Sequence, residues 1–141
     1  MLYDHPIRLP FELEFDASSA GASRARQAAR IYLDQERISS KTAADLELVV
    51  SELAANAVQQ QPDEPVRLTV TVQLDGVQIR VTNAATSHSL PVTTWRRSKD
   101  EVTNETRERG WGLEIVESLT DSLICENAEG WTSVVCFRRF D

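Results

Sequence analysis

Residues 46–58, LELVVSELAANAV, are the stretch of the chain that decides how the rest is interpreted. Apolar side chains recur there every three or four positions, which is the period of a helix with one broad apolar face. Leu48 and Ala55 make much of the remaining circumference apolar or small as well. The pattern therefore predicts a helix that is buried on most sides, in which two polar residues, Glu52 and Asn56, lie one turn apart.

Glu52 and Asn56 allow two interpretations. A carboxylate in an apolar setting costs free energy unless it is paired, hydrated or used. In the functional interpretation, Glu52 polarises a hydroxyl or a water, and Asn56 offers its amide oxygen to Mg²⁺, a hard cation that prefers oxygen ligands. In the structural interpretation, both residues form a solvated edge of the helix and Asn56 hydrogen-bonds the backbone. The spacing is common, so by itself it favours the second interpretation.

The segments around this helix predict an α+β fold. Alternating, β-branched patterns indicate five strands, over residues 7–15, 66–73, 77–83, 122–126 and 131–138, with hairpin turns at Asp75-Gly76 and Glu129-Gly130. A first helix is expected over residues 20–36 after a cap at Ser18 or Ser19, and the long helix begins after Ser39 or Ser40 and ends before Pro62. We expect a single domain over residues 1–141, in which helices cover one face of a mostly antiparallel sheet.

A long polar segment precedes the last predicted helix. Residues 84–108 hold few large apolar side chains, and loops of that length in compact domains are usually functional or disordered. Gly110-Trp111-Gly112-Leu113 then opens a helix. Glycines allow a close backbone approach, and first-turn amides bind phosphate. A plain turn before a helix is the alternative interpretation.

Asn83 and a group of arginines are further candidates. Asn83 ends a strand in Thr82-Asn83-Ala84-Ala85, where it would contact a base or cap a turn. The first helix carries Arg24, Arg26 and Arg30, which form either a solvated face with pairs such as Arg30 to Asp34 or a docking site for an acidic partner.

Charge and cysteine content narrow the functional classes. The chain has 141 residues and a net charge of −7, which disfavours direct binding to nucleic acid or to an anionic membrane surface. No signal peptide and no apolar stretch of roughly 20 residues is evident. Cys125 and Cys136 lie in apolar runs, as expected for reduced, buried thiols in the cytoplasm.

In this order, the motifs resemble the GHKL ATPase superfamily with its Bergerat fold, and they are most similar to the anti-sigma-factor serine/threonine kinases. LELVVSELAANAV is similar to the N-box of that family, and RGWGLEIVESL is similar to its second glycine box. The resemblance implies a two-layer sandwich that binds ATP and Mg²⁺, with the loop of residues 84–108 as its ATP lid. It further implies a cytoplasmic homodimer that binds a sigma factor and phosphorylates an anti-anti-sigma partner with a STAS domain.

The resemblance also assigns roles to individual residues. Glu52 matches the proposed general base, and Asn56 matches the asparagine that coordinates Mg²⁺. The glycines that hold the phosphates match Gly110 and Gly112, followed by Leu113. The final-strand hydroxyl that contacts adenine matches Thr132 or Ser133, and the arginine that contacts the sigma factor and its antagonist matches Arg26.

One position departs from the family pattern. The first glycine box places an aspartate at the strand end to accept a hydrogen bond from the adenine amino group, whereas this chain has Asn83 and no following glycine. The Asn83 carbonyl would accept the same bond without charge and in one amide orientation only. Losing the charge would cost about 1–2 kcal/mol. A non-catalytic switch module that binds nucleotide weakly or not at all is therefore the alternative function.

Overall fold

The computed structural model describes residues 8–60, 63–84, 93–98, 113–128 and 130–141. In chain order, its elements are β1 (Phe11–Phe15), α1 (Ser19–Gln35), α2 (Ser40–Gln59), β2 (Val66–Val72), β3 (Gly76–Ala84), β4 (Thr93–Ser98), α4 (Glu114–Leu119), β5 (Ser122–Ala128) and β6 (Trp131–Arg139).

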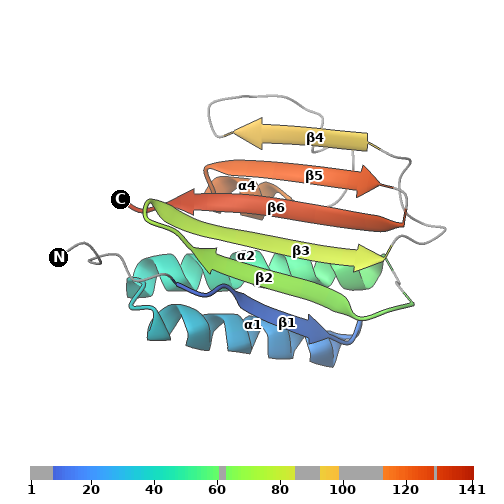
Figure 1. Ribbon diagram of the computed structural model, residues 1–141, viewed down its shortest axis with the longest axis horizontal. Helices are drawn as coiled ribbons and strands as arrows, with labels where there is room; N and C mark the ends of the chain where they lie inside the picture. The colour runs from blue at the N-terminus through green and yellow to red at the C-terminus, as the bar shows by residue number, and fades with distance from the viewer. Residues whose placement is uncertain (1–7, 61–62, 85–92, 99–112, 129) are drawn as a thin grey trace.

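The strands form one antiparallel sheet in the order β1-β2-β3-β6-β5-β4. The hairpins β2–β3 and β5–β6 meet along β3 and β6, so the last strand lies in the middle of the sheet. The helices lie in one layer behind it, with α2 between α1 and α4 (Figure 1). The predicted α+β class, with helices on one face of a mostly antiparallel sheet, is confirmed.

The apolar alternation of the strands decides which face the helices cover. In β2, the side chains of Val66, Leu68, Val70 and Val72 are buried, whereas Arg67 is exposed. Successive strand residues point to opposite faces, so the first four face the helices and Arg67 faces away from them. The same alternation in β3 buries Val77, Ile79 and Val81 in the core between the sheet and α2.

Both predicted hairpins form, for different reasons. Gly130 has a φ of 96°, which a residue with a side chain rarely adopts. At Gly76, the reason is space, because a Cβ atom there would lie 2.3 Å from the backbone oxygen of Arg138. The two turns set the register of the sheet.

The ends of α1 and α2 are fixed by local hydrogen bonds. Ser18 Oγ accepts a hydrogen bond from the Gly21 amide at 3.0 Å, and Ser39 Oγ accepts one from the Thr42 amide at 3.3 Å. Of the two caps that the sequence offers for each helix, Ser18 and Ser39 are the ones used. Beyond α1, Arg37 adopts a left-handed φ of 62°, and the Ile38 amide donates to the Leu33 carbonyl at 3.1 Å. This is the Schellman motif, whose left-handed position usually holds glycine.

Two expectations are wrong in part. Residues 93–98, inside the segment predicted as one loop, form the edge strand β4 paired with β5, and Ala84 belongs to β3. An edge strand is defined by its pairing partner, so its own sequence pattern is a weak signal. The other positions of the predicted lid lie outside the described residues. The helix α2 is not buried on most sides, because Leu48 is 46% exposed and Ala55 is also exposed.

Cys125 and Cys136 are both buried. Burial raises the pKa of the Cys136 thiol to about 12, so this thiol stays protonated at neutral pH. Among the described helices, none has the length and apolar character needed to cross a membrane.

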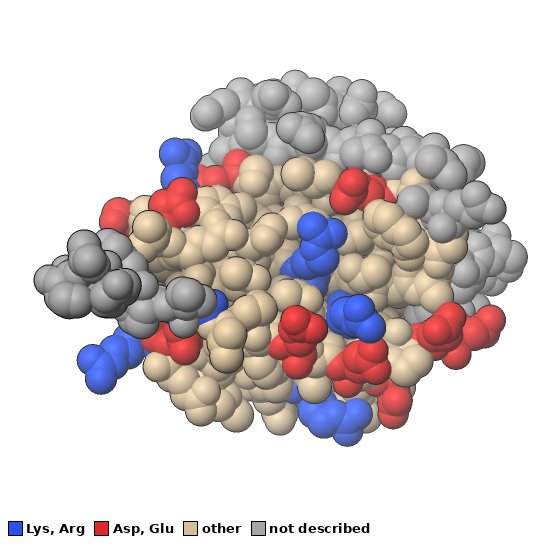
Figure 2. Space-filling view, viewed as in Figure 1, with Lys and Arg blue, Asp and Glu red and all other residues tan. Residues whose placement is uncertain are grey.

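None of the described helices covers the other face of the sheet. Figure 2 shows this face, where charged side chains of both signs are interspersed with uncharged ones. Glu14 and Arg67 form an ion pair there at 3.0 Å (Glu14 Oε2 to Arg67 Nη2).

Candidate functional site

A small cavity lies where the C-terminal half of α2 crosses β3 and β6. Its volume is about 20 Å³, close to that of one water molecule. It is lined by Leu53, Asn56, Ala57, Gln60, Val81, Asn83, Thr132 and Val134. Three residues that the sequence singled out, Asn56, Asn83 and Thr132, therefore meet at one place although they come from three elements. A ligand of purine size fits there only if the walls of the cavity move apart.

The strand register distinguishes Thr132 from Ser133. Thr132 lies opposite Asn83, and both are buried on the face that α2 covers. Ser133 lies opposite Thr82 on the other face of the sheet. There, its Oγ accepts a hydrogen bond from Arg80 Nη1 at 3.0 Å and lies 3.1 Å from Thr82 Oγ1. Of the two candidate hydroxyls, Thr132 lies at the cavity and Ser133 does not.

The amide of Asn83 is held in one orientation. Its Nδ2 donates a hydrogen bond to the Ala84 carbonyl oxygen at 3.1 Å. A carbonyl oxygen only accepts, so the nitrogen must be the atom on that side. The Oδ1 of Asn83 is then the amide atom left for a ligand, and it can accept a hydrogen bond as a carboxylate would.

Several polar atoms around this cavity are buried without a partner. Among the described residues, the buried side-chain atoms without a hydrogen bond are Asn56 Nδ2, Thr132 Oγ1, and both Nδ2 and Oδ1 of Asn127. Leaving such an atom unsatisfied costs about 1–3 kcal/mol. The cost is therefore concentrated at one end of the molecule. A bound ligand that supplied donors and acceptors would recover it.

Glu52 lies one turn before Asn56 on α2, and its side chain is half-buried. Within the described part of the chain, it makes no hydrogen bond or ion pair. The helix therefore presents a carboxylate and an amide on adjacent turns of one face.

The sequence matches the family of histidine kinase-like ATPase domains over residues 15–138. The chain belongs to this family. Its fold is that of a nucleotide-binding domain, and the cavity with Asn56, Asn83 and Thr132 is a site within an ATPase-type domain. No curated protein matches the sequence.

Two solved structures have a fold similar to that of this chain. One holds the RsbU and RsbW domains of Rv1364c from Mycobacterium tuberculosis. It has a TM-score of 0.70 and 18% identity, over 94% of this chain and 32% of that chain. The other is the SiaB–SiaC complex from Pseudomonas aeruginosa, with a TM-score of 0.65 and 13% identity, over 90% of this chain and 89% of that chain. This chain therefore spans about a third of the length of the Rv1364c chain.

Of the glycine motif Gly110-Trp111-Gly112-Leu113, the described residues include Leu113. Gly110 and Gly112 are outside the described residues. Leu113 is fully buried and precedes α4, which is only six residues long (Glu114–Leu119). The Leu113 carbonyl oxygen accepts a hydrogen bond from the Glu117 amide at 2.8 Å, which starts the helix. Leu113 thus anchors α4 in the core through its side chain.

A cation at this site would depend on few protein ligands. Among the placed residues, no group of three or more His, Cys, Asp or Glu side chains could hold a metal ion. Mg²⁺ is commonly held by one or two protein oxygens together with substrate phosphates and water. Asn56, with Glu52 one turn away, fits that pattern.

Arg26 lies away from the cavity, at the contact between α1 and α2. It pairs with Glu47 Oε2 through Nη1. Glu47 Oε1 also accepts a hydrogen bond from Arg30 Nη1 at 2.9 Å, and Arg30 Nε in turn pairs with Asp34 at 3.1 Å. The pairs with Asp34 and Glu47 raise the pKa of Arg30. Glu47 therefore links Arg26 and Arg30 to α2. The sequence pattern did not single out Glu47 because its partners are on another helix.

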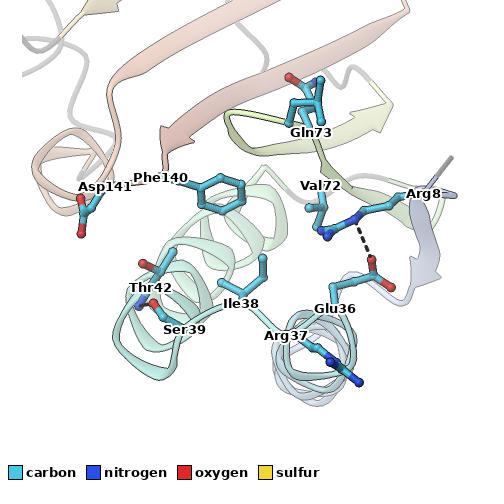
Figure 3. Close-up of a pocket in the computed structure, with 11 residues that line it drawn as sticks. Arg8, Glu36, Arg37, Ile38, Ser39, Thr42, Val72, Gln73, Phe140 and Asp141 are labelled. Carbon is cyan, nitrogen blue, oxygen red and sulfur yellow. Dashed lines mark hydrogen bonds and ion pairs between the residues drawn. The ribbon is translucent and has the colours of Figure 1, made fainter. Parts of the chain in front are cut away.

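A wider hollow lies elsewhere in the described structure. It has a volume of about 830 Å³ and lies at the other end of α2, between the α1–α2 turn, the β2–β3 hairpin and the C-terminus. Figure 3 shows Ile38, Val72 and Phe140 around it and the ion pair of Arg8 Nε with Glu36 Oε1 at 3.6 Å. None of the residues predicted for the nucleotide site lines it.

Sequence reasoning missed Gln60, which lines the cavity, and it also missed Asn127. It lies on β5, directly opposite Thr132, and is 3% exposed. The sequence offers no signal for it, because Glu126-Asn127 reads as the approach to a hairpin and its burial depends on the pairing of β5 with β6.

Proposed function

We propose that this ATPase-type domain binds ATP with Mg²⁺ between α2 and the sheet and transfers the γ-phosphoryl group to a serine or threonine of a partner protein. The observation that carries the proposal is the set of unpartnered polar atoms on Asn56 and Thr132 around a cavity that Asn83 also lines. Polar atoms that no protein group satisfies suit a ligand that satisfies them. A nucleotide is the ligand for which this family of domains is named.

Each residue has a role in this proposal. Asn83 Oδ1 and the Thr132 hydroxyl would bind the edge of the base. Asn56 would offer its amide oxygen to the metal and its nitrogen to a phosphate oxygen. The metal would neutralise charge that develops on the phosphates. The backbone at Gly110 and Gly112 would hold the phosphates.

Glu52 would act as the general base. The Oγ of the acceptor residue attacks the γ-phosphorus, and the bond to the bridging oxygen of ADP breaks. The hydroxyl proton passes to the Glu52 carboxylate. Glu52 suits this role because it lies one turn from Asn56 and no described residue occupies its carboxylate.

The partner in this proposal is an anti-anti-sigma protein with a STAS domain, and the domain is an anti-sigma factor in a partner-switching system. Two observations support it. The Rv1364c structure includes an RsbW domain, and the SiaB structure is a complex with a second protein, SiaC. Arg26, which is part of a basic group on α1 held by Glu47, would contact the partner and the sigma factor.

We also propose a cytoplasmic homodimer. Two buried cysteines in a chain of 141 residues suit a reducing compartment. A symmetric dimer needs a self-complementary surface, and the face of the sheet opposite the helices carries both charges, with Glu14 and Arg67 close together. Sedimentation equilibrium tests the dimer, and Arg67→Glu should weaken it.

The experiment that tests the kinase activity compares Glu52→Gln with wild type. The variant should keep the melting temperature and the ATP affinity, while transfer of labelled phosphate to a STAS-domain protein slows by roughly 10²–10⁴-fold. Glu64→Gln is the matched control, since Glu64 is an exposed carboxylate away from the cavity. Full activity in Glu52→Gln would overturn the catalytic role.

The alternative function is a non-catalytic switch module. The neutral Asn83 and the cavity of only about 20 Å³ favour it. A wild-type protein that binds its partner and ATP yet never transfers phosphate would establish this alternative.

A further inference from the structure

Burial of the Asn127 side-chain amide costs free energy, and no hydrogen bond from a described residue offsets that cost. Its side chain is 3% exposed, and neither Nδ2 nor Oδ1 has a hydrogen-bond partner. An amide that serves the fold is normally satisfied by the protein, because burying it unsatisfied opposes folding. An asparagine with a purely structural role should therefore have hydrogen-bond partners for its buried amide.

The buried hydroxyl of Thr120, at the end of α4, shows the contrast. Thr120 is 1% exposed, and its Oγ1 donates to the Val116 carbonyl at 2.7 Å. Within the described ranges, the unpartnered buried side chains are confined to Asn56, Thr132 and Asn127. The lack of partners is thus a property of one region and not of buried polar residues in general.

The strand register places Asn127 beside the cavity. It lies opposite Thr132 on β6, which in turn lies opposite Asn83 on β3. Side chains directly opposite each other in antiparallel strands point to the same face, with Cβ atoms about 4.5–5.5 Å apart. Asn83, Thr132 and Asn127 therefore form one polar row, about 10 Å long across three strands, on the face toward the helices. The preceding residue on that face of β5 is Cys125, which is fully buried.

We infer that Asn127 is a third base-contacting residue of the nucleotide site and hydrogen-bonds the edge of a purine through its amide. An asparagine amide presents a donor beside an acceptor, and the edge of adenine presents an amino donor beside a ring-nitrogen acceptor. A row of about 10 Å matches the two fused rings of a purine, whereas a single pyrimidine ring is too short to reach from Asn83 to Asn127. The inference rests on the proposed nucleotide binding and adds a residue that sets the preference among bases.

The test replaces Asn127 with valine in the full chain. Asn127→Val removes both unpartnered atoms and places a strand-favouring side chain in a strand. The free protein should keep or gain melting temperature. Its affinity for Mg·ATP should fall about ten-fold, and the ratio of ATP to UTP affinity should fall toward one. Thr120→Val is the control: it loses a hydrogen bond that is made, so it should lower the melting temperature and leave both affinities unchanged.

Three outcomes would overturn the inference. A lower melting temperature with unchanged ATP affinity would make Asn127 structural. An equal loss of ATP and UTP affinity would place its contact on the ribose or the phosphates. Wild-type protein that binds no nucleotide would remove the proposed function and this inference together, and that result is distinct because it does not depend on the variant. If Asn127→Val does not fold, the side-chain amide NMR signals of Asn127 in wild type decide: they should shift on adding Mg·ATP and not on adding Mg·UTP.

Discussion

Thr132 on β6 lies directly opposite Asn83 on β3, and both are buried on the side of the sheet that α2 covers. This pairing brings a hydroxyl and an amide from distant parts of the chain to the same small cavity as Asn56. Ser133, the next residue in sequence, therefore points to the face of the sheet away from α2.

Restoring a carboxylate at position 83 should strengthen nucleotide binding. In Asn83→Asp, the acceptor that Oδ1 now provides would carry a charge, and charge-assisted hydrogen bonds are about twice as strong as neutral ones. We expect Mg·ATP affinity to rise about ten-fold by calorimetric titration. The free protein should be less stable, because position 83 is only 5% exposed and the charge is buried there. Unchanged affinity would show that the base does not meet residue 83.

The two neighbouring hydroxyls should respond in opposite ways. Thr132→Val removes an unpartnered polar atom, so it should leave stability unchanged or higher and weaken Mg·ATP binding. Ser133→Ala breaks the contacts with Arg80 and Thr82, so it should lower the free energy of unfolding by about 1 kcal/mol and leave affinity unchanged. Urea unfolding and titration of both variants measure the two effects. Exchanged outcomes would mean that the register of β6 is shifted by one residue.

Glycine at position 37 should stabilise the fold. Arg37 holds a left-handed φ of 62° at the end of α1, and its side chain pairs with no described residue. Arg37→Gly removes the steric cost of the left-handed conformation. This gain should outweigh the added flexibility of the unfolded chain, so the free energy of unfolding should rise by roughly 0.5–1 kcal/mol. Arg37→Ala is the control, since alanine keeps the steric cost, and it should give no gain in thermal unfolding. An equal gain in both variants would place the effect in the arginine side chain.

Asp45 should make stability depend on acid pH. Burial acts to raise the pKa of Asp45, but the hydrogen bond from Arg138 and the charge of Lys41 outweigh burial and lower the pKa below its ordinary value. The Asp45 Oδ2 to Arg138 Nη1 distance is 3.0 Å. A lowered pKa in the folded state adds stability above the unfolded pKa of ~3.9, and this stability is lost as the pH falls through the folded pKa.

Asp45→Asn measures that contribution. The difference in unfolding free energy between wild type and variant should be largest near neutral pH and should shrink below about pH 4. Urea unfolding at several pH values provides the measurement. A difference that stays constant down to pH 2 would show that Asp45 acts through something other than its charge.

The sequence predicted the parts of the fold that depend on local chemistry. Serine caps and the glycine turns are visible in a few residues, so Ser18, Ser39 and Gly130 could be identified before the fold was known. The strand β4 could not, because its pairing with β5 defines it. Leu48 seemed buried because an apolar residue on a helix does not reveal which side faces water.

For the candidate site too, the sequence revealed residues with a local signal and missed those that depend on contacts between elements. Asn56 and Glu52 stand out in sequence because they interrupt an apolar helix. The choice between Thr132 and Ser133 needed the register of β6, and Asn127 needed the pairing of β5 with Thr132. Glu47 was missed because it meets Arg26 and Arg30 across two helices. Contacts between elements were the missing information each time.

Calorimetric titration of wild type and Asn56→Ala with Mg·ATP tests the central claim most directly. Asn56 lines the cavity with an unpartnered Nδ2, so its loss should leave the fold intact and remove contacts with the metal and the phosphates. The account predicts that wild type binds with a dissociation constant in the micromolar range or weaker, that saturating nucleotide raises its melting temperature, and that Asn56→Ala binds at least about ten-fold more weakly. A wild-type protein that gives no binding heat and no shift in melting temperature at millimolar Mg·ATP would contradict it.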